Sequence, residues 1–96
     1  MGDTEGAARE SRLGAQISAD KTNLQAATFD TNSGLRLLTV GDLEGAISQF
    51  RAAIALAPSY APAHFHLAEA LRRQGAAAEA SREFQRAAEL DPRLKP

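Results

Sequence analysis

The two histidines, His64 and His66, carry the side chains best suited to metal binding or proton transfer in this sequence. Residues two apart on a helix point about 200° apart, whereas the histidine pair of a helical zinc site is spaced by four. The sequence holds no third histidine and no cysteine that could complete a metal site. We therefore expect no metal ion and no cofactor.

The carboxylates that could act as general acids or bases stand at the spacing of ordinary surface ion pairs. Each of three glutamates lies three or four residues before an arginine: Glu69 before Arg72 and Arg73, Glu79 before Arg82, and Glu83 before Arg86. Such pairs on a helix contribute a few tenths of a kcal/mol each. The sequence offers no Ser-His-Asp arrangement and no glycine-rich phosphate loop. We therefore predict that the chain is not an enzyme.

Charge and composition restrict the class of partner. The 96 residues carry 11 basic and 12 acidic side chains, for a net charge of −1, without the basic excess typical of nucleic-acid-binding domains. No apolar run approaches the roughly 20 residues of a membrane span, and the start MGDTEGAARE lacks the features of a secretory signal. We expect one soluble domain, cytoplasmic by default and bacterial in its abundance of Ala and Arg. The ending DPRLKP favours a piece of a larger protein.

The residues discussed above lie on segments with helical patterns. Alanine is abundant and β-branched residues are few, which favours helix over strand. Apolar residues at three- and four-residue spacing predict helices over residues 43–56, 60–73 and 77–90. Glycines and prolines mark the turns and stops between these segments: Gly41, Pro58, Gly75 and Pro92.

Upstream of these segments, one long helix is expected from about Glu10 to Thr39, after a disordered stretch over residues 1–9. The alternative is two helices broken near Asp20-Lys21, where the apolar face is interrupted. The polar run over residues 30–34 is a weak helix former, because its short polar side chains and its glycine favour turns.

Two stretches of the chain repeat with an offset of 34 residues. The pairs that match are Gly41 and Gly75, Ala46 and Ala80, Phe50 and Phe84, Ala53 and Ala87, Leu56 and Leu90, and Pro58 and Pro92. A constant period of this length is typical of arrays in which each repeat is one helical hairpin.

The second copy, over about residues 61–94, resembles a tetratricopeptide repeat. Its second half carries all the positions of the family pattern: Gly75, Ala80, Phe84, Ala87 and Pro92. In its first half Leu67 matches the pattern, while three positions depart from it. His64 replaces the opening aromatic residue, Ala68 replaces a glycine and Leu71 replaces a tyrosine.

The first copy, over about residues 27–60, resembles the same repeat. It keeps six pattern positions: Gly34, Gly41, Ala46, Phe50, Ala53 and Pro58. Asp30 stands at the tryptophan position, Ser33 at the leucine position and Leu37 at the tyrosine position. The resemblance implies an all-α fold, a right-handed solenoid of antiparallel helix pairs with about four helices. It divides the chain into a disordered start over 1–9, a helical extension over 10–26, two repeats over 27–94 and a tail over 95–96.

The repeated residues have physical roles in such a hairpin. Small Ala46 and Ala80 allow the helices to approach closely, and Phe50 and Phe84 fill the space between successive hairpins. A single hairpin cannot bury its apolar face alone, so neighbours must stack. We therefore predict an exposed apolar strip on the last helix, covered by a further helix or by self-association.

The resemblance also implies where a partner would bind, because the first helix of each hairpin lines the concave surface of the family. The corresponding residues are Thr28, Thr31, Leu35, Leu38, Thr39, Pro62, Phe65, His66, Glu69, Arg72 and Arg73. Phe65 beside two arginines would suit a segment with an apolar anchor and an acidic group. The alternative is that Phe65 packs against the long first helix. The Lys and Asn with which some members hold a chaperone carboxylate are replaced by Thr31, Leu35, Pro62 and His66, which excludes that ligand class.

These expectations favour a non-catalytic protein-interaction module, as part of a scaffold or regulatory protein, with a protein or peptide as its partner. A second hypothesis is a structural element that self-associates through its N-terminal helix or its uncovered last helix. A third is an appendage that positions a neighbouring enzyme domain.

Overall fold

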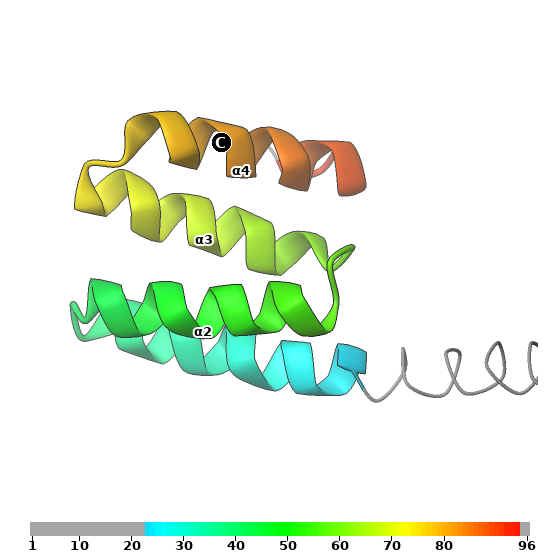
Figure 1. Cartoon of the computed structure of the whole chain (residues 1–96), viewed down its shortest axis with the longest axis horizontal. Coiled ribbons are helices and arrows are strands. Elements are labelled where there is room, and N and C mark those ends of the chain that lie inside the picture. The colour runs from blue at the N-terminus through cyan, green and yellow to red at the C-terminus, as the bar shows by residue number, and fades with distance from the viewer. Residues whose placement is uncertain (1–22, 95–96) are drawn as a thin grey trace, which may run out of the picture.

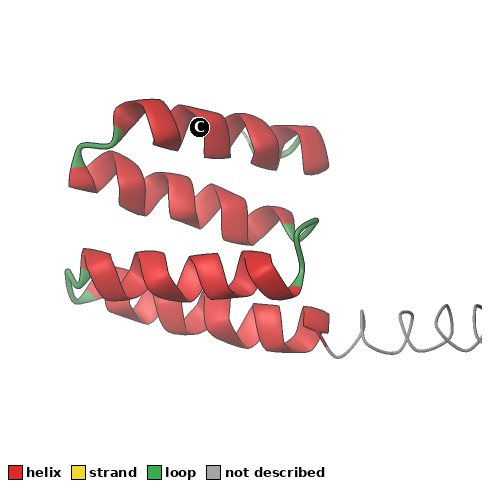
Figure 2. Cartoon of the chain, viewed as in Figure 1, coloured by secondary structure: helices red, strands yellow, loops and turns green. Residues whose placement is uncertain are grey.

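A computed structural model of the chain describes residues 23–94, which form helices joined by short turns (Figures 1 and 2). A helix covers residues 23–39, and three more follow: α2 (Leu43–Leu56), α3 (Ala61–Gln74) and α4 (Ala77–Leu90). Figure 1 shows α4 beside α3, α3 beside α2, and the 23–39 helix beside α2, with the turns at alternating ends. The predicted all-α class of antiparallel helix pairs is confirmed.

The turns repeat as precisely as the sequence does. Each of α2 and α4 has 14 residues, and their first residues are 34 apart. Gly41 and Gly75 both have a positive φ, of 85° and 96°, a backbone region that side chains with a β-carbon disfavour. At the start of α2, the Asp42 carboxylate accepts a hydrogen bond from the Gly45 amide at 3.0 Å. This is the cap that the sequence predicts.

The polar run in the first helix does not break it, since residues 23–39 are helical throughout. Thr31 uses its hydroxyl within the helix, donating to the Ala27 carbonyl at 2.7 Å. Packing of Ala27 and Leu38 in the core outweighs the weak helix propensity of the run. The predictions for residues 1–22, including the helix from Glu10 and its alternative break near Asp20-Lys21, lie outside the described residues.

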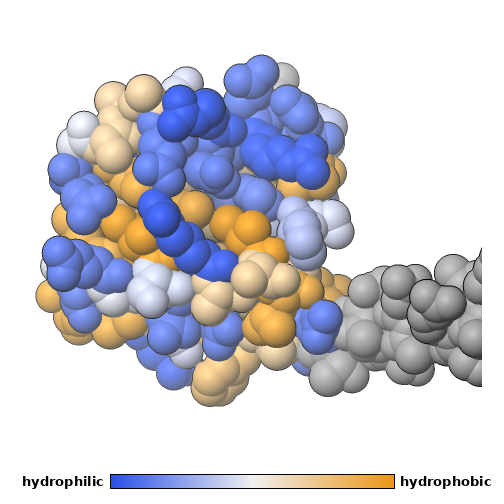
Figure 3. Space-filling view, viewed as in Figure 1, coloured by the Kyte–Doolittle hydropathy of each residue, from blue (hydrophilic) through white to orange (hydrophobic). Residues whose placement is uncertain are grey.

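The core lies between successive helices and is built around Phe50, whose side chain is 0% exposed. Ala46 and Ala53 are also completely buried, as expected for positions of close helix contact. Among residues 23–94, no helix combines the length and apolar character needed to cross a membrane. Figure 3 shows apolar side chains over α2 and α3, whereas this face of α4 is mainly hydrophilic.

Gly34 allows the Phe50 ring to lie directly against the first helix. A β-carbon at this position would be 2.5 Å from Cε1 of Phe50, which is too close for any real contact. At the corresponding position of the second repeat, Ala68 carries that β-carbon and is itself completely buried. Phe84 therefore cannot use the position that Phe50 uses, and its ring packs edge-on against Phe65 with centroids 5.3 Å apart.

Replacing Gly34 with alanine is expected to lower the free energy of unfolding by about 1–2 kcal/mol. The clash with a fixed ring costs about 1–3 kcal/mol, and the better helix propensity of alanine returns up to about 1 kcal/mol. Urea denaturation followed by circular dichroism measures the change. Asn32→Ala is the control, since Asn32 is exposed on the same helix and should gain stability. Equal gains in both variants would contradict the packing of Phe50 on Gly34.

His64 joins three elements at the position of the family's opening aromatic residue. It is buried, with Nε2 2.7 Å from the Pro58 carbonyl oxygen and Nδ1 2.7 Å from Oε1 of Glu83. Both partners are oxygen acceptors, so each ring N–H donates to one of them. The ring therefore links α3 to the turn before it and to α4.

Candidate functional site

The predicted binding residues of α3 form one connected cluster. The Phe65 ring packs edge-on against His66, with centroids 5.5 Å apart, and against Phe84 of α4. His66 stacks on Phe50 at 5.9 Å, and its Nδ1 lies 2.7 Å from Oε1 of Glu69. Phe65, His66 and Glu69 all remain partly exposed. The cluster thus offers an aromatic edge and a polar pair on a rigid support.

Arg72 and Arg73 follow this cluster at the C-terminal end of α3 and are both exposed. Within residues 23–94, neither forms a salt bridge. The sequence suggested that Glu69 would pair with them, but Glu69 is bound to His66 instead. Both guanidinium groups are consequently available to an acidic ligand.

The other two expected ion pairs along α4 are also wrong. Glu79 binds Arg51 of α2 at 2.9 Å, not Arg82, and Glu83 binds His64, not Arg86. Helix spacing alone does not decide which cation is nearest, because neighbouring helices bring charges equally close. The glutamates therefore hold α4 against the rest of the chain.

The predicted residues of the first helix contribute less than expected. Thr31 is 3% exposed and Leu38 is 7% exposed, so neither has a side chain to offer a partner. Leu38 packs in the core with α2 and α3. Leu35 is partly buried against the same core, and Thr39 is exposed but donates to the Leu35 carbonyl. The α3 residues therefore form the larger part of the candidate site.

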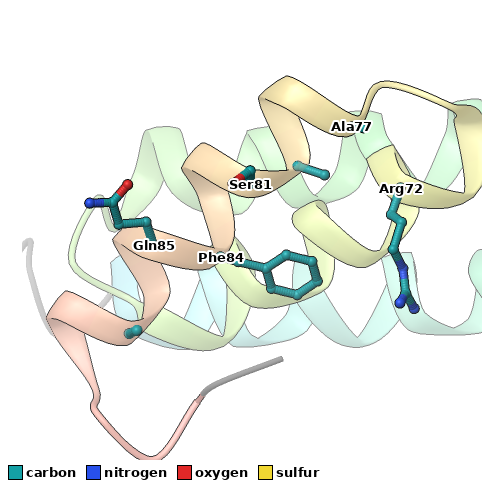
Figure 4. A pocket seen from close by; sticks show the side chains of 7 residues that line it. Arg72, Ala77, Ser81, Phe84 and Gln85 are labelled. Carbon is teal, nitrogen blue, oxygen red and sulfur yellow. The ribbon is translucent and has the colours of Figure 1, made fainter.

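A groove of about 360 Å³ opens on α4 next to the end of α3. Figure 4 shows the Phe84 ring pointing from α4 toward α3, with the Arg72 side chain extending on the same side. The lining residues are Arg72, Ala77, Ala80, Ser81, Phe84, Gln85 and Ala88. This confirms the predicted apolar strip on the last helix, although Ser81, Gln85 and Ala88 were missed. Comparison with positions 34 residues earlier would have found them.

At the C-terminal end of α4, Arg93 donates to both carboxylate oxygens of Asp91, at 3.0 and 2.9 Å. These hydrogen bonds hold the pKa of the Asp91 carboxyl below its usual range. The pair is therefore complete at neutral pH and is lost as the pH falls through the lowered pKa of Asp91.

Metal or cofactor chemistry has no support among the described residues. His64 and His66 point to different partners, as their spacing predicted. Within residues 23–94, no three His, Asp or Glu side chains are grouped closely enough to hold a metal ion.

Comparisons with known proteins agree with this architecture. A model of the tetratricopeptide repeat matches residues 31–94, which is more than half of the chain. Comparison with curated proteins gives no match. The match covers both hairpins, including Gly34, Phe50 and Phe84. With four helices in two hairpins and this match, the chain belongs to the tetratricopeptide repeat family.

Proposed function

We propose that this chain is a non-catalytic module that binds a segment of a partner protein on its concave face, mainly through α3. Tetratricopeptide repeats generally mediate protein–protein interaction and are typically non-catalytic. The curvature of such arrays creates extended binding surfaces. A role within a scaffold or regulatory protein, and a cytoplasmic location, stay predictions.

The observation that supports this proposal most directly is the pair Arg72 and Arg73. Both are exposed, without a salt bridge in the described part of the chain, and adjacent to the partly exposed Phe65. Guanidinium groups bind carboxylates with two parallel hydrogen bonds. An aromatic side chain beside them supplies apolar contact of the kind that dominates interface energies. The proposed ligand is therefore an extended acidic segment with one large apolar side chain.

The proposal is tested with two synthetic peptides of equal length, each carrying one leucine, one rich in Asp and Glu and the other in Lys. Titration calorimetry is expected to show binding of the acidic peptide only. The double variant Arg72→Glu/Arg73→Glu should weaken that binding by about tenfold per arginine, because hydrogen bonds to charged groups contribute about 1.5–3 kcal/mol.

The matched control is the double variant Arg82→Glu/Arg86→Glu on α4, which changes the net charge equally. Arg82 has no salt bridge among residues 23–94, and the exposed contact of Arg86 with Glu89 is 3.6 Å long, so stability should hardly change. Equal loss of peptide binding in the two double variants would show general charge attraction and contradict a site on α3. Unchanged binding in the α3 variant would also overturn the proposal.

A further inference from the structure

The junction between the two hairpins shows how one repeat covers the next. The first hairpin presents a row of large side chains: Leu38, Leu43, Ile47, Phe50 and Ile54. α3 covers this row with residues that are partly small: Ala63, Leu67, Ala70 and Leu71. Large side chains on one surface thus meet alanines on the other.

The equivalent row of the second hairpin, 34 residues later, is the lining of the groove on α4. We call it the tail face, and it consists of Arg72, Ala77, Ser81, Phe84 and Ala88. Only the phenylalanine is retained, while Leu43, Ile47 and Ile54 give way to two alanines and a serine. The groove of about 360 Å³ is the space that the lost aliphatic groups leave.

The first helix carries the surface equivalent to the covering side of α3. We call it the head face, and it consists of Phe29, Ser33, Arg36, Leu37 and Val40. Phe29 is 67% exposed and Val40 is 76% exposed, two of the three large apolar side chains exposed among residues 23–94. They stand where α3 has Ala63 and Gln74. On the head face, therefore, side chains are larger where those on the tail face are smaller.

We propose that the head face of one copy of this chain docks on the tail face of a second copy, as α3 docks on the first hairpin. Ala63 packs in one cluster with Ile54, and the equivalent contact joins Phe29 of the second copy to Ala88. The large side chain has changed sides, so the summed volume is kept. Association buries the exposed Phe29 and Val40 and fills the groove.

Charges modulate this contact. Leu38 and Ala70 belong to one cluster at the internal junction, so Arg72 and Arg36 of the second copy are brought together at the equivalent place. Like charges keep the association weak, and added salt is expected to strengthen it by screening them. Because the head and tail faces differ, the contact can repeat and lead to open-ended assemblies.

The test uses the full chain with one face blocked at a time. Phe29→Asp blocks the head face and Ser81→Glu blocks the tail face, and both positions are exposed, so folding should be unchanged. Analytical ultracentrifugation up to millimolar protein is expected to show that the mass of the original chain grows beyond a dimer. Each variant alone should remain a monomer, with a dissociation constant raised by about tenfold or more.

An equimolar mixture of the two variants provides the decisive measurement, since each retains one intact face. The expected result is a dimer that contains one copy of each and grows no further. Association of either variant as strong as that of the original chain, a mixture that stays monomeric, or an original chain that stays monomeric would each overturn the proposal. Circular dichroism melting confirms that both variants are folded.

Arg72→Glu separates this inference from binding of an acidic segment on α3. It places a carboxylate opposite Arg36, so self-association should become stronger by about tenfold. The same change should weaken binding of the acidic peptide. Weaker self-association in Arg72→Glu would contradict head-to-tail docking while leaving the peptide-binding proposal unaffected.

Discussion

Replacing Phe50 with alanine is expected to cost about 3–5 kcal/mol of the free energy of unfolding, the range for removal of a buried aromatic ring. The ring is completely buried, lies against Gly34, and stacks on His66 of the next hairpin. Its loss opens a cavity at the junction between the repeats. Since small domains have only about 5–15 kcal/mol to lose, the variant should be close to unfolding at room temperature. Urea denaturation measures the difference.

The matched control is Phe84→Ala, the same substitution one repeat later. Phe84 is partly exposed at the groove and contacts Phe65, so its removal leaves a space that water can reach. We expect a loss less than half that of Phe50→Ala, measured at protein concentrations where the chain is monomeric. Equal losses would show that the two phenylalanines are equivalent and that the open side of α4 makes no difference to stability.

Replacing His64 with alanine is expected to cost about 2–4 kcal/mol, since it leaves two hydrogen-bonding groups without their partner. These groups are the Pro58 carbonyl and the Glu83 carboxylate, each 2.7 Å from a ring nitrogen. Thermal unfolding followed by circular dichroism, together with urea denaturation, measures the effect. Hydrogen exchange in the turn before α3 should also become faster, because the ring holds that turn in place.

Glu83→Gln separates the two contacts of His64. The amide oxygen can still accept from the ring, so only the charge is lost and the cost should stay well below that of His64→Ala. His64→Phe is the second control, since it restores the family's aromatic at this position but supplies no N–H donor. Stability of His64→Phe equal to that of the original chain would show that the ring packs without a useful hydrogen bond.

The fold could be predicted in detail because its determinants are local and repeated. The predicted helices over residues 43–56 and 77–90 coincide with α2 and α4, and the helix predicted over 60–73 differs from α3 by one residue at each end. Glycines and prolines act within a few residues of their own position, and a 34-residue period checks each boundary twice. Only the polar run in the first helix misled, because tertiary packing outweighs propensity there.

The candidate site was less predictable because it depends on distances between helices. The exposed character of Arg72 and Arg73 follows from their place on α3. The burial of Thr31 and Leu38 does not, since it arises from how the second hairpin covers the first. The pairing of Glu79 with Arg51 spans 28 residues, and no local spacing rule could identify it.

The nesting of Phe50 on Gly34 also fixes the order of the two repeats along the chain. If residues 27–60 and 61–94 were exchanged, Arg72 would take the core position of Leu38, which is 7% exposed. Phe50 would then stand at the open end of the molecule, with no following hairpin to cover it. Such a permuted chain would keep every residue and every local signal, yet we expect it to fold poorly. Each hairpin is therefore specialised for its place, and the two are not interchangeable parts.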